Sequence, residues 1–160
     1  MSLKILLNQI VKILKKNQIR ISTAESCTGG LIAYWLTKIP GSSSYFSLGI
    51  IPYQEEEKHR LLKIDPRLLK QYQGVSPSIA SQMAERVRKI AGADIGISTT
   101  GFAGPSGGTK IAPRGTVYIG IASAKKTHVY KFYFGGKREE VRRKTLVKTL
   151  LLLRDFLNNF

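Results

Sequence analysis

The feature that most restricts the possible folds is the alternation of helical and strand-like patterns along the chain. In residues 3–16 apolar side chains recur at helical spacing, and residues 19–24 then predict a short strand. The same patterns predict further helices at residues 31–36, 54–62, 77–91 and 138–157, and further strands at residues 47–53, 94–100, 116–123 and 127–134. Helices alternating with strands, with a final antiparallel hairpin, predict a three-layer α/β/α fold around a mixed, mostly parallel sheet flanked by helices.

The size of the chain and its apolar runs restrict the class of protein. A chain of 160 residues suits one ordinary domain, so we expect residues 1–160 to form a single unit. The longest apolar runs, such as residues 150–153, fall far short of the ~20 residues of a membrane span. The single cysteine, Cys27, cannot form an internal disulfide. We therefore predict a cytoplasmic protein with no part embedded in a membrane.

The chain carries a formal net charge of +16, and much of it lies near the carboxyl end. Residues 113–160 hold eleven Lys and Arg residues against three acidic ones, a net charge of +8. Such a surface concentrates anions, including nucleic acids, nucleotides and phosphate esters, without selecting one of them. A solvated basic surface with no ligand is the simpler interpretation.

The turn at residues 24–30, with the sequence Ala-Glu-Ser-Cys-Thr-Gly-Gly, lies between the first predicted strand and the next helix. Ligands of open α/β sheets gather at this edge, and N–H groups of the first helical turn can bind an anion or an oxyanion. Ser26 is placed to act as a nucleophile, and Cys27 competes with it for that role. The alternative is that Ser26 or Thr28 only caps the helix, as such residues do in most proteins.

A serine nucleophile needs a base, and the two histidines, His59 and His128, show no spacing typical of a Ser-His-Asp triad. A lysine whose amine is kept neutral by burial can replace histidine, and Lys58 is the candidate. The alternative is an ordinary surface lysine paired with neighbouring glutamates. A Ser-x-x-Lys match at Ser123 and Lys126 places its serine at the end of a predicted strand, and we interpret it as chance.

Residues 101–109, Gly-Phe-Ala-Gly-Pro-Ser-Gly-Gly-Thr, are too rich in glycine for a regular element and predict a loop. Its N–H groups follow the carboxyl end of a strand and suit contact with a phosphate or ribose. The segment matches neither the Walker pattern nor Gly-x-Gly-x-x-Gly, which disfavours ATP and dinucleotides, and a flexible surface loop is the alternative. One cysteine and two scattered histidines form no ligand cluster, so we predict no metal and no cofactor.

Four blocks of sequence distinguish this chain from a generic α/β domain. The first is Thr-Ala-Glu-Ser-Cys-Thr-Gly-Gly at residues 23–30, followed by Pro-Gly-Ser-Ser at residues 40–43. The others are residues 53–58 with Leu61 and Leu62, residues 74–76 leading to residues 93–96, and residues 100–105 continuing through 107–109 to 115–117. Together these blocks resemble the CinA C-terminal domain family, in the family's order and over nearly the whole chain.

This resemblance implies a three-layer α/β/α fold and hydrolysis of the carboxamide of nicotinamide mononucleotide to nicotinic acid mononucleotide and ammonia, a salvage step in pyridine nucleotide metabolism. It implies that Ser26 is the nucleophile, Lys58 its base, and Tyr53 a partner that orients groups or relays protons. With the turn and loop described above, the residues expected to contact the substrate are Glu25, Cys27, Thr28, Gly29, Gly30, Thr100, Gly101, Gly104, Gly107, Gly108 and Thr109. The expected partner is nicotinamide mononucleotide or a related pyridine nucleotide, and we expect a homo-oligomer.

Two features of the chain leave alternatives to this function. An asparagine expected between the family's tyrosine and lysine is replaced around Glu55, and a carboxylate there favours the charged form of Lys58 and opposes its use as a base. A nucleotide-binding module without catalytic activity is therefore one alternative. A nucleic-acid-binding protein is another, because the basic segment 125–148 has interleaved aromatic residues, although a strand at that place also suits core packing. These aromatic residues are Tyr130, Phe132, Tyr133 and Phe134.

Overall fold

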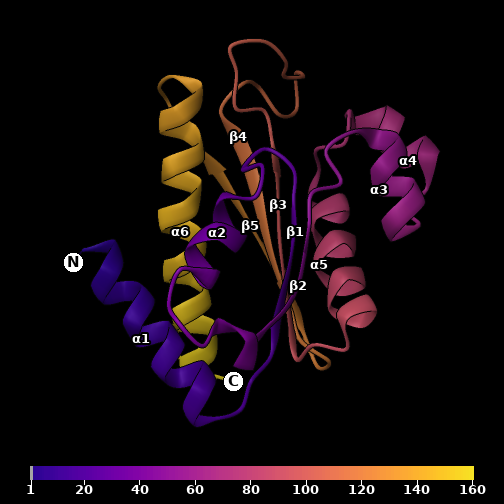
Figure 1. Cartoon of the computed structure of the whole chain (residues 1–160). Helices are drawn as coiled ribbons and strands as arrows, with labels where there is room; N and C mark the ends of the chain where they lie inside the picture. Colours follow the sequence, from indigo (N-terminus) through magenta and orange to yellow (C-terminus); the bar gives the residue numbers. More distant parts are fainter. Residues whose placement is uncertain (1) are drawn as a thin grey trace.

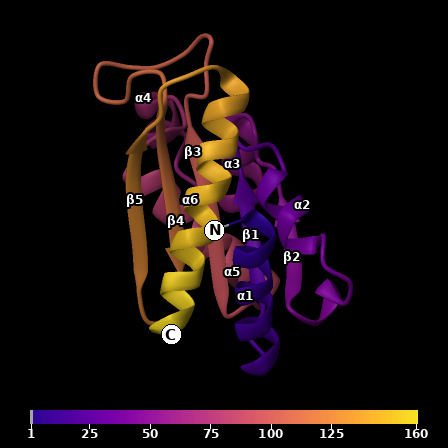
Figure 2. The same ribbon diagram turned by 90° about the vertical axis from the view of Figure 1, so that its left-hand side faces the viewer.

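The computed structural model describes residues 2–160, which form a five-stranded sheet with helices on both faces (Figure 1, Figure 2). In chain order the elements are α1 (Leu3–Lys16), β1 (Ile21–Glu25), α2 (Leu31–Thr37), the short 3-10 helix η1 (Ser42–Ser44), β2 (Phe46–Ile50), α3 (Glu55–Leu62), α4 (Pro66–Tyr72), α5 (Pro77–Ala91), β3 (Ile95–Gly101), β4 (Thr116–Ala122), β5 (Thr127–Tyr133) and α6 (Arg138–Asn158). Every helix and strand that the sequence predicts is present, with ends shifted by a few residues.

The strand order is β2-β1-β3-β4-β5. Strand β1 runs parallel to β2 and β3, whereas β4 is antiparallel to both β3 and β5. The sheet is therefore mixed, as predicted, and its pairings are divided equally between the two kinds. Because β1 and β3 are parallel and Glu25 pairs with Thr99, both strands end at the same edge. The turn after β1 and the loop after β3 are thus brought together.

Two helical layers cover the sheet (Figure 1). Helices α1, α2 and α6 pack on one face, where the predicted buried leucines of the last helix, Leu146, Leu150, Leu153 and Leu157, join the main apolar cluster. Helices α3, α4 and α5 cover the other face through a second cluster around Ala24 of β1. All five residues of β1 are buried, which fits a central strand covered on both sides.

Helix α4 is the one α-helix that the sequence patterns did not predict. It begins with clear local signals, since Asp65 accepts a hydrogen bond from the N–H of Arg67 at 2.8 Å and Pro66 occupies the first helical position. The helix buries a single apolar side chain, Leu69, so no apolar stripe marks it in the sequence. Ser76 caps α5 as predicted, by accepting a hydrogen bond from the N–H of Ile79 at 3.1 Å.

Helix α5 packs closely on the sheet at Gly96 of β3. A Cβ at this position would overlap the carbonyl oxygen of Ala84 and lie 2.7 Å from Cβ of Arg88, so the packing distance requires glycine. None of the helices formed by residues 2–160 combines the length and the apolar character needed to cross a membrane.

Candidate active site

Ser26 occupies the first position of the turn that follows β1. Its backbone N–H donates to the carbonyl oxygen of Thr99 at 2.9 Å, and its own carbonyl oxygen accepts from the N–H of Gly29 at 3.0 Å. Gly29 and Gly30 adopt positive φ angles of 59° and 93°, a conformation that glycine adopts at little cost. The turn is therefore held by its own hydrogen bonds and directs Ser26 into a pocket at the end of the sheet.

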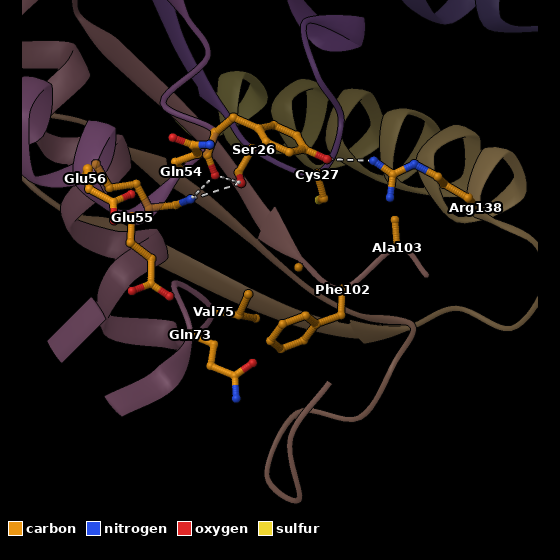
Figure 3. Close-up of a pocket in the computed structure, with 13 residues that line it drawn as sticks. Ser26, Cys27, Gln54, Glu55, Glu56, Gln73, Val75, Phe102, Ala103 and Arg138 are labelled. Carbon is orange, nitrogen blue, oxygen red and sulfur yellow. Dashed lines mark hydrogen bonds between the residues drawn. The ribbon is translucent and has the colours of Figure 1, made fainter. Parts of the chain in front are cut away.

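The side chain of Lys58 reaches Ser26 from the other helical layer. Its Nζ lies 3.1 Å from Oγ of Ser26 and 3.0 Å from the carbonyl oxygen of Tyr53 (Figure 3). Lys58 is only 3% exposed, although it lies on a short helix rich in glutamate. Gly74 lies beside the amine with a positive φ of 74°, and a Cβ there would make an ordinary contact with Nζ at 3.5 Å. The structure thus joins two predicted residues that are 32 positions apart.

Burial lowers the pKa of Lys58 from its ordinary value of 10.5 to about 8, because a charged amine is poorly solvated inside the protein. A Cys27 thiolate and the Glu55 carboxylate would both favour the protonated amine, but Cys27 is almost fully protonated at neutral pH, so Glu55 is the charge that opposes the lowering there. The effect of burial is larger. A considerable fraction of Lys58 is therefore neutral at mildly alkaline pH and can accept a proton from Ser26.

Cys27, the competing nucleophile, lies beside Ser26 in a different environment. Its side chain is buried, and burial together with the nearby Glu25 carboxylate raises the pKa of its thiol to about 12. Only the thiolate is a strong nucleophile, and a thiol with this pKa is almost fully protonated at neutral pH. The environment of the turn thus favours Ser26.

Glu25 fills the position at the start of α2 where the sequence predicts a bound anion. One carboxylate oxygen accepts from the N–H groups of Gly30 and Ile32, at 3.1 and 3.0 Å, and the other from the N–H of Ala33 at 2.8 Å. The hydroxyl of Thr28 also donates to Glu25, at 2.6 Å, and lies 2.6 Å from Oγ1 of Thr99. These helix donors are therefore engaged by the protein itself, which corrects the expectation that they hold a ligand or an oxyanion.

Tyr53 contributes to the site through its backbone and its ring. Its carbonyl oxygen accepts from Lys58, while its side chain is 49% exposed at the edge of the pocket. The hydroxyl of Tyr53 accepts a hydrogen bond from Nη2 of Arg138 at 2.6 Å. Nη1 of the same arginine donates to the carbonyl oxygen of Gly104 at 2.9 Å. Arg138 thus ties the tyrosine to the loop that follows β3.

The pocket around Ser26 has a volume of about 690 Å³, within the usual range for small-molecule sites. Its lining residues are Ser26, Cys27, Tyr53, Gln54, Glu55, Glu56, Lys58, Gln73, Val75, Gly101, Phe102, Ala103 and Arg138. Two glutamates, Glu55 and Glu56, stand on one side, and Arg138 stands on the other (Figure 3). The pocket therefore has a negative wall and a positive wall.

Several predicted contact residues lie outside this lining and have structural contacts instead. Thr100 donates its hydroxyl to the carbonyl oxygen of Gly74 at 2.7 Å, and Thr109 accepts from the N–H of Ala112 at 2.9 Å. The remaining residues outside the lining are Glu25, Thr28, Gly29, Gly30, Gly104, Gly107 and Gly108. Of the predicted loop residues, the structure brings only Gly101 to the pocket, together with its unpredicted neighbours Phe102 and Ala103.

Sequence reasoning missed Arg138, the residue with the clearest charge on the far wall. Its only sequence signal is its place at the start of the last predicted helix, which says nothing of Tyr53 or the pocket. Gln73 and Val75 were missed too, because they follow the unpredicted helix α4. Within residues 2–160 no group of three or more His, Cys, Asp or Glu side chains is arranged to hold a metal ion.

Comparison with known proteins agrees with this architecture. The profile of the CinA C-terminal domain matches residues 3–157. A CinA-like protein from Endomicrobium trichonymphae is 46% identical over 143 residues, which cover 89% of this chain and 33% of that protein. The chain thus spans about a third of the length of such curated relatives.

Solved structures show the same fold over the full chain. A CinA superfamily protein from Klebsiella pneumoniae has a TM-score of 0.94 and 27% identity, and covers 100% of both chains. The competence/damage inducible protein CihA from Agrobacterium tumefaciens has a TM-score of 0.91 and 33% identity, with 99% of both chains covered. On these matches, and on the α/β/α sheet with its serine turn, the chain belongs to the CinA C-terminal domain family.

Proposed function

We propose that this protein hydrolyses the carboxamide of nicotinamide mononucleotide, with Ser26 as nucleophile and Lys58 as base. The observation that carries the proposal is the distance of 3.1 Å between the buried Lys58 amine and the Ser26 hydroxyl, inside a pocket of substrate size. Burial lowers the pKa of the amine to about 8, so the lysine can take the place of the histidine found in serine hydrolases.

The reaction has two halves. In the first, Oγ of Ser26 attacks the carboxamide carbon while neutral Lys58 takes the hydroxyl proton. The lysine ammonium then gives that proton to the amide nitrogen, and the C–N bond breaks to release ammonia and leave the acyl-enzyme. In the second half, Lys58 activates a water molecule that attacks the acyl-enzyme, which releases the carboxylic acid and restores Ser26. Because Glu25 occupies the helix donors, we assign the oxyanion to the backbone N–H of Cys27, the residue that follows the nucleophile.

The charges of the pocket support a substrate that carries both signs. Nicotinamide mononucleotide has a pyridinium ring and a phosphate, and its pyridinium would lie toward Glu55 and Glu56. Its phosphate would lie toward Arg138, whose guanidinium is suited to phosphate oxygens. The Tyr53 hydroxyl holds this arginine in place in the free protein.

The test is to incubate the purified chain with nicotinamide mononucleotide and to measure ammonia and the deamidated nucleotide. We expect product from the wild type and from Cys27→Ala, and at least a 1,000-fold loss of kcat in Ser26→Ala, as for other covalent nucleophiles. Full activity in Ser26→Ala would overturn the assignment of the nucleophile. Binding of the nucleotide without any product would instead favour a nucleotide-binding module that lacks catalytic activity.

A further inference from the structure

The free edge of the sheet carries a row of aromatic side chains, two of which, Phe132 and Phe134, pack in part against the apolar cluster around Val141. Strand β5 is the edge strand, and alternate residues along it and just beyond its end place His128, Tyr130, Phe132 and Phe134 on one side. The rings of His128 and Tyr130 stack with centroids 6.2 Å apart, and those of Phe132 and Phe134 stack at 5.4 Å. His128 is exposed and the other three are half-buried, so the row borders solvent along its whole length.

Lysine side chains lie beside these rings. Nζ of Lys148, on α6, is 5.6 Å from the ring centroid of Phe132. Nζ of Lys126 lies 5.2 Å from the ring of Phe156, which itself contacts His128 edge to face at 5.8 Å. We call this set of residues the β5–α6 strip: His128, Tyr130, Phe132, Phe134, Lys126 and Lys148.

The surroundings of the strip are strongly basic. A hollow of about 250 Å³ at its Phe134 end is lined by Arg143, Lys144 and Lys148 among others. Among residues 2–160, none of the ion pairs includes Lys126, Lys144 or Lys148. The nearby acidic residues are engaged elsewhere, since Glu139 pairs with Arg142, Asp155 pairs with Arg154, and Glu140 accepts from the N–H of Lys137. The ammonium groups of the strip are thus available to an anion.

We propose that the β5–α6 strip binds single-stranded nucleic acid. Proteins that bind single strands without sequence preference combine aromatic rings, on which bases stack, with cations that follow the phosphate backbone. Both occur here, and the rings occupy four alternate positions from His128 to Phe134, a distance of about 20 Å, which accommodates several nucleotides. A small anion would contact the lysines but would not cover a row of rings. An acidic peptide would pair with the lysines but has few flat groups to stack on the rings.

Binding of an anionic strand at the strip would involve part of the positive charge of the chain, which the Ser26 pocket does not. That pocket contains two glutamates beside its arginine, whereas the strip contains no acidic residue. The proposal does not depend on the chemistry proposed for Ser26, because the two sites share no residue.

The test measures binding of a fluorescent oligothymidylate to the full chain by anisotropy, at 50 and 200 mM salt. We expect affinity to fall steeply with salt, and a duplex of equal length to bind more weakly because its bases cannot reach the rings. Lys148→Gln should lower the steepness of the log–log salt dependence by about 0.7, the value for one phosphate contact on a single strand. Lys16→Gln, which removes an exposed lysine from α1, is the matched control and should leave the affinity nearly unchanged.

The ring contribution is tested with Phe132→Leu, which keeps an apolar side chain against the core but removes the aromatic face. It should weaken binding about fivefold or more, while Tyr34→Leu, which removes an exposed ring from α2, should not. Equal binding of duplex and single strand, or equal effects of the strip variants and their controls, would overturn the proposal. So would absence of binding with a change of sedimentation in the strip variants, since the edge of β5 would then be an interface between copies of this chain.

Discussion

Replacing Lys58 with methionine should remove activity and, at neutral pH, make the protein more stable. Methionine has a similar length but no charge and no amine. The substitution therefore removes a buried ammonium group that is only 3% exposed, together with its hydrogen bonds to Ser26 and to the carbonyl oxygen of Tyr53. The stability of the variant relative to wild type depends on which of these two losses is larger.

The magnitude follows from the pKa of Lys58. It is about 8 in the folded protein and near 10.5 in the unfolded chain, so the charged amine costs about 3 kcal/mol of stability at pH 7. Loss of two hydrogen bonds costs about 2 kcal/mol, which leaves the variant more stable by about 1 kcal/mol. As pH rises through 8, the folded wild type loses its proton before the unfolded chain does, so the stability of the wild type increases.

Between pH 7 and pH 9.5 the wild type should therefore gain about 2 kcal/mol relative to Lys58→Met, and the order of the two stabilities should reverse. The assay is urea unfolding of both proteins at the two pH values. Lys4→Met is the control, because Lys4 is exposed on α1 and its variant should differ from wild type equally at both values. A difference for Lys58→Met that does not change with pH would refute the argument that burial lowers the pKa of this amine.

Three further predictions concern the pocket and its support. The rate of deamidation should rise with pH through about 8 as Lys58 loses its proton. Because the Glu55 carboxylate favours the charged lysine, Glu55→Gln should move this rise to lower pH. An unchanged pH–rate profile in Glu55→Gln would contradict this effect of the carboxylate on Lys58. Glu25→Gln should lower the free energy of unfolding, measured in urea, by about 3 kcal/mol, because an amide cannot accept hydrogen bonds from all the donors that the carboxylate binds. Glu139→Gln on the surface is the control and should change this free energy by less than about 0.5 kcal/mol. Gly96→Ala should lower the free energy of unfolding by about 3 kcal/mol, because the added Cβ would overlap a carbonyl oxygen of α5. An unchanged melting temperature in this variant would show that α5 can move away from the sheet.

The sequence allowed most of the fold to be predicted because periodicity and capping are local properties. The buried leucines of α6 and the Ser76 cap of α5 follow from residues three or four positions apart. Helix α4 was missed because its one buried side chain, Leu69, forms no such pattern.

The site was predictable only in part, since its contacts join distant segments. Ser26 and Lys58 could be selected as a nucleophile and a base by type and by resemblance, but their contact depends on how α3 packs beside β1. The carboxylate of Glu25 reaches donors five to eight residues ahead, a spacing that no capping pattern describes. Arg138 comes to the pocket from the far end of the chain, and no local signal connects it to Tyr53.

The position of Glu25 at the start of α2 has a consequence for how the protein responds to its medium. Many turns of this kind take up phosphate, sulfate or chloride from solution, and their shape then depends on which ion is present. Here the anion is the carboxylate of Glu25, which is covalently part of the chain. It therefore cannot dissociate or exchange with ions in solution. The turn that holds Ser26 should consequently keep one shape in any buffer, and inorganic anions would compete with substrate only at the arginine on the opposite wall of the pocket.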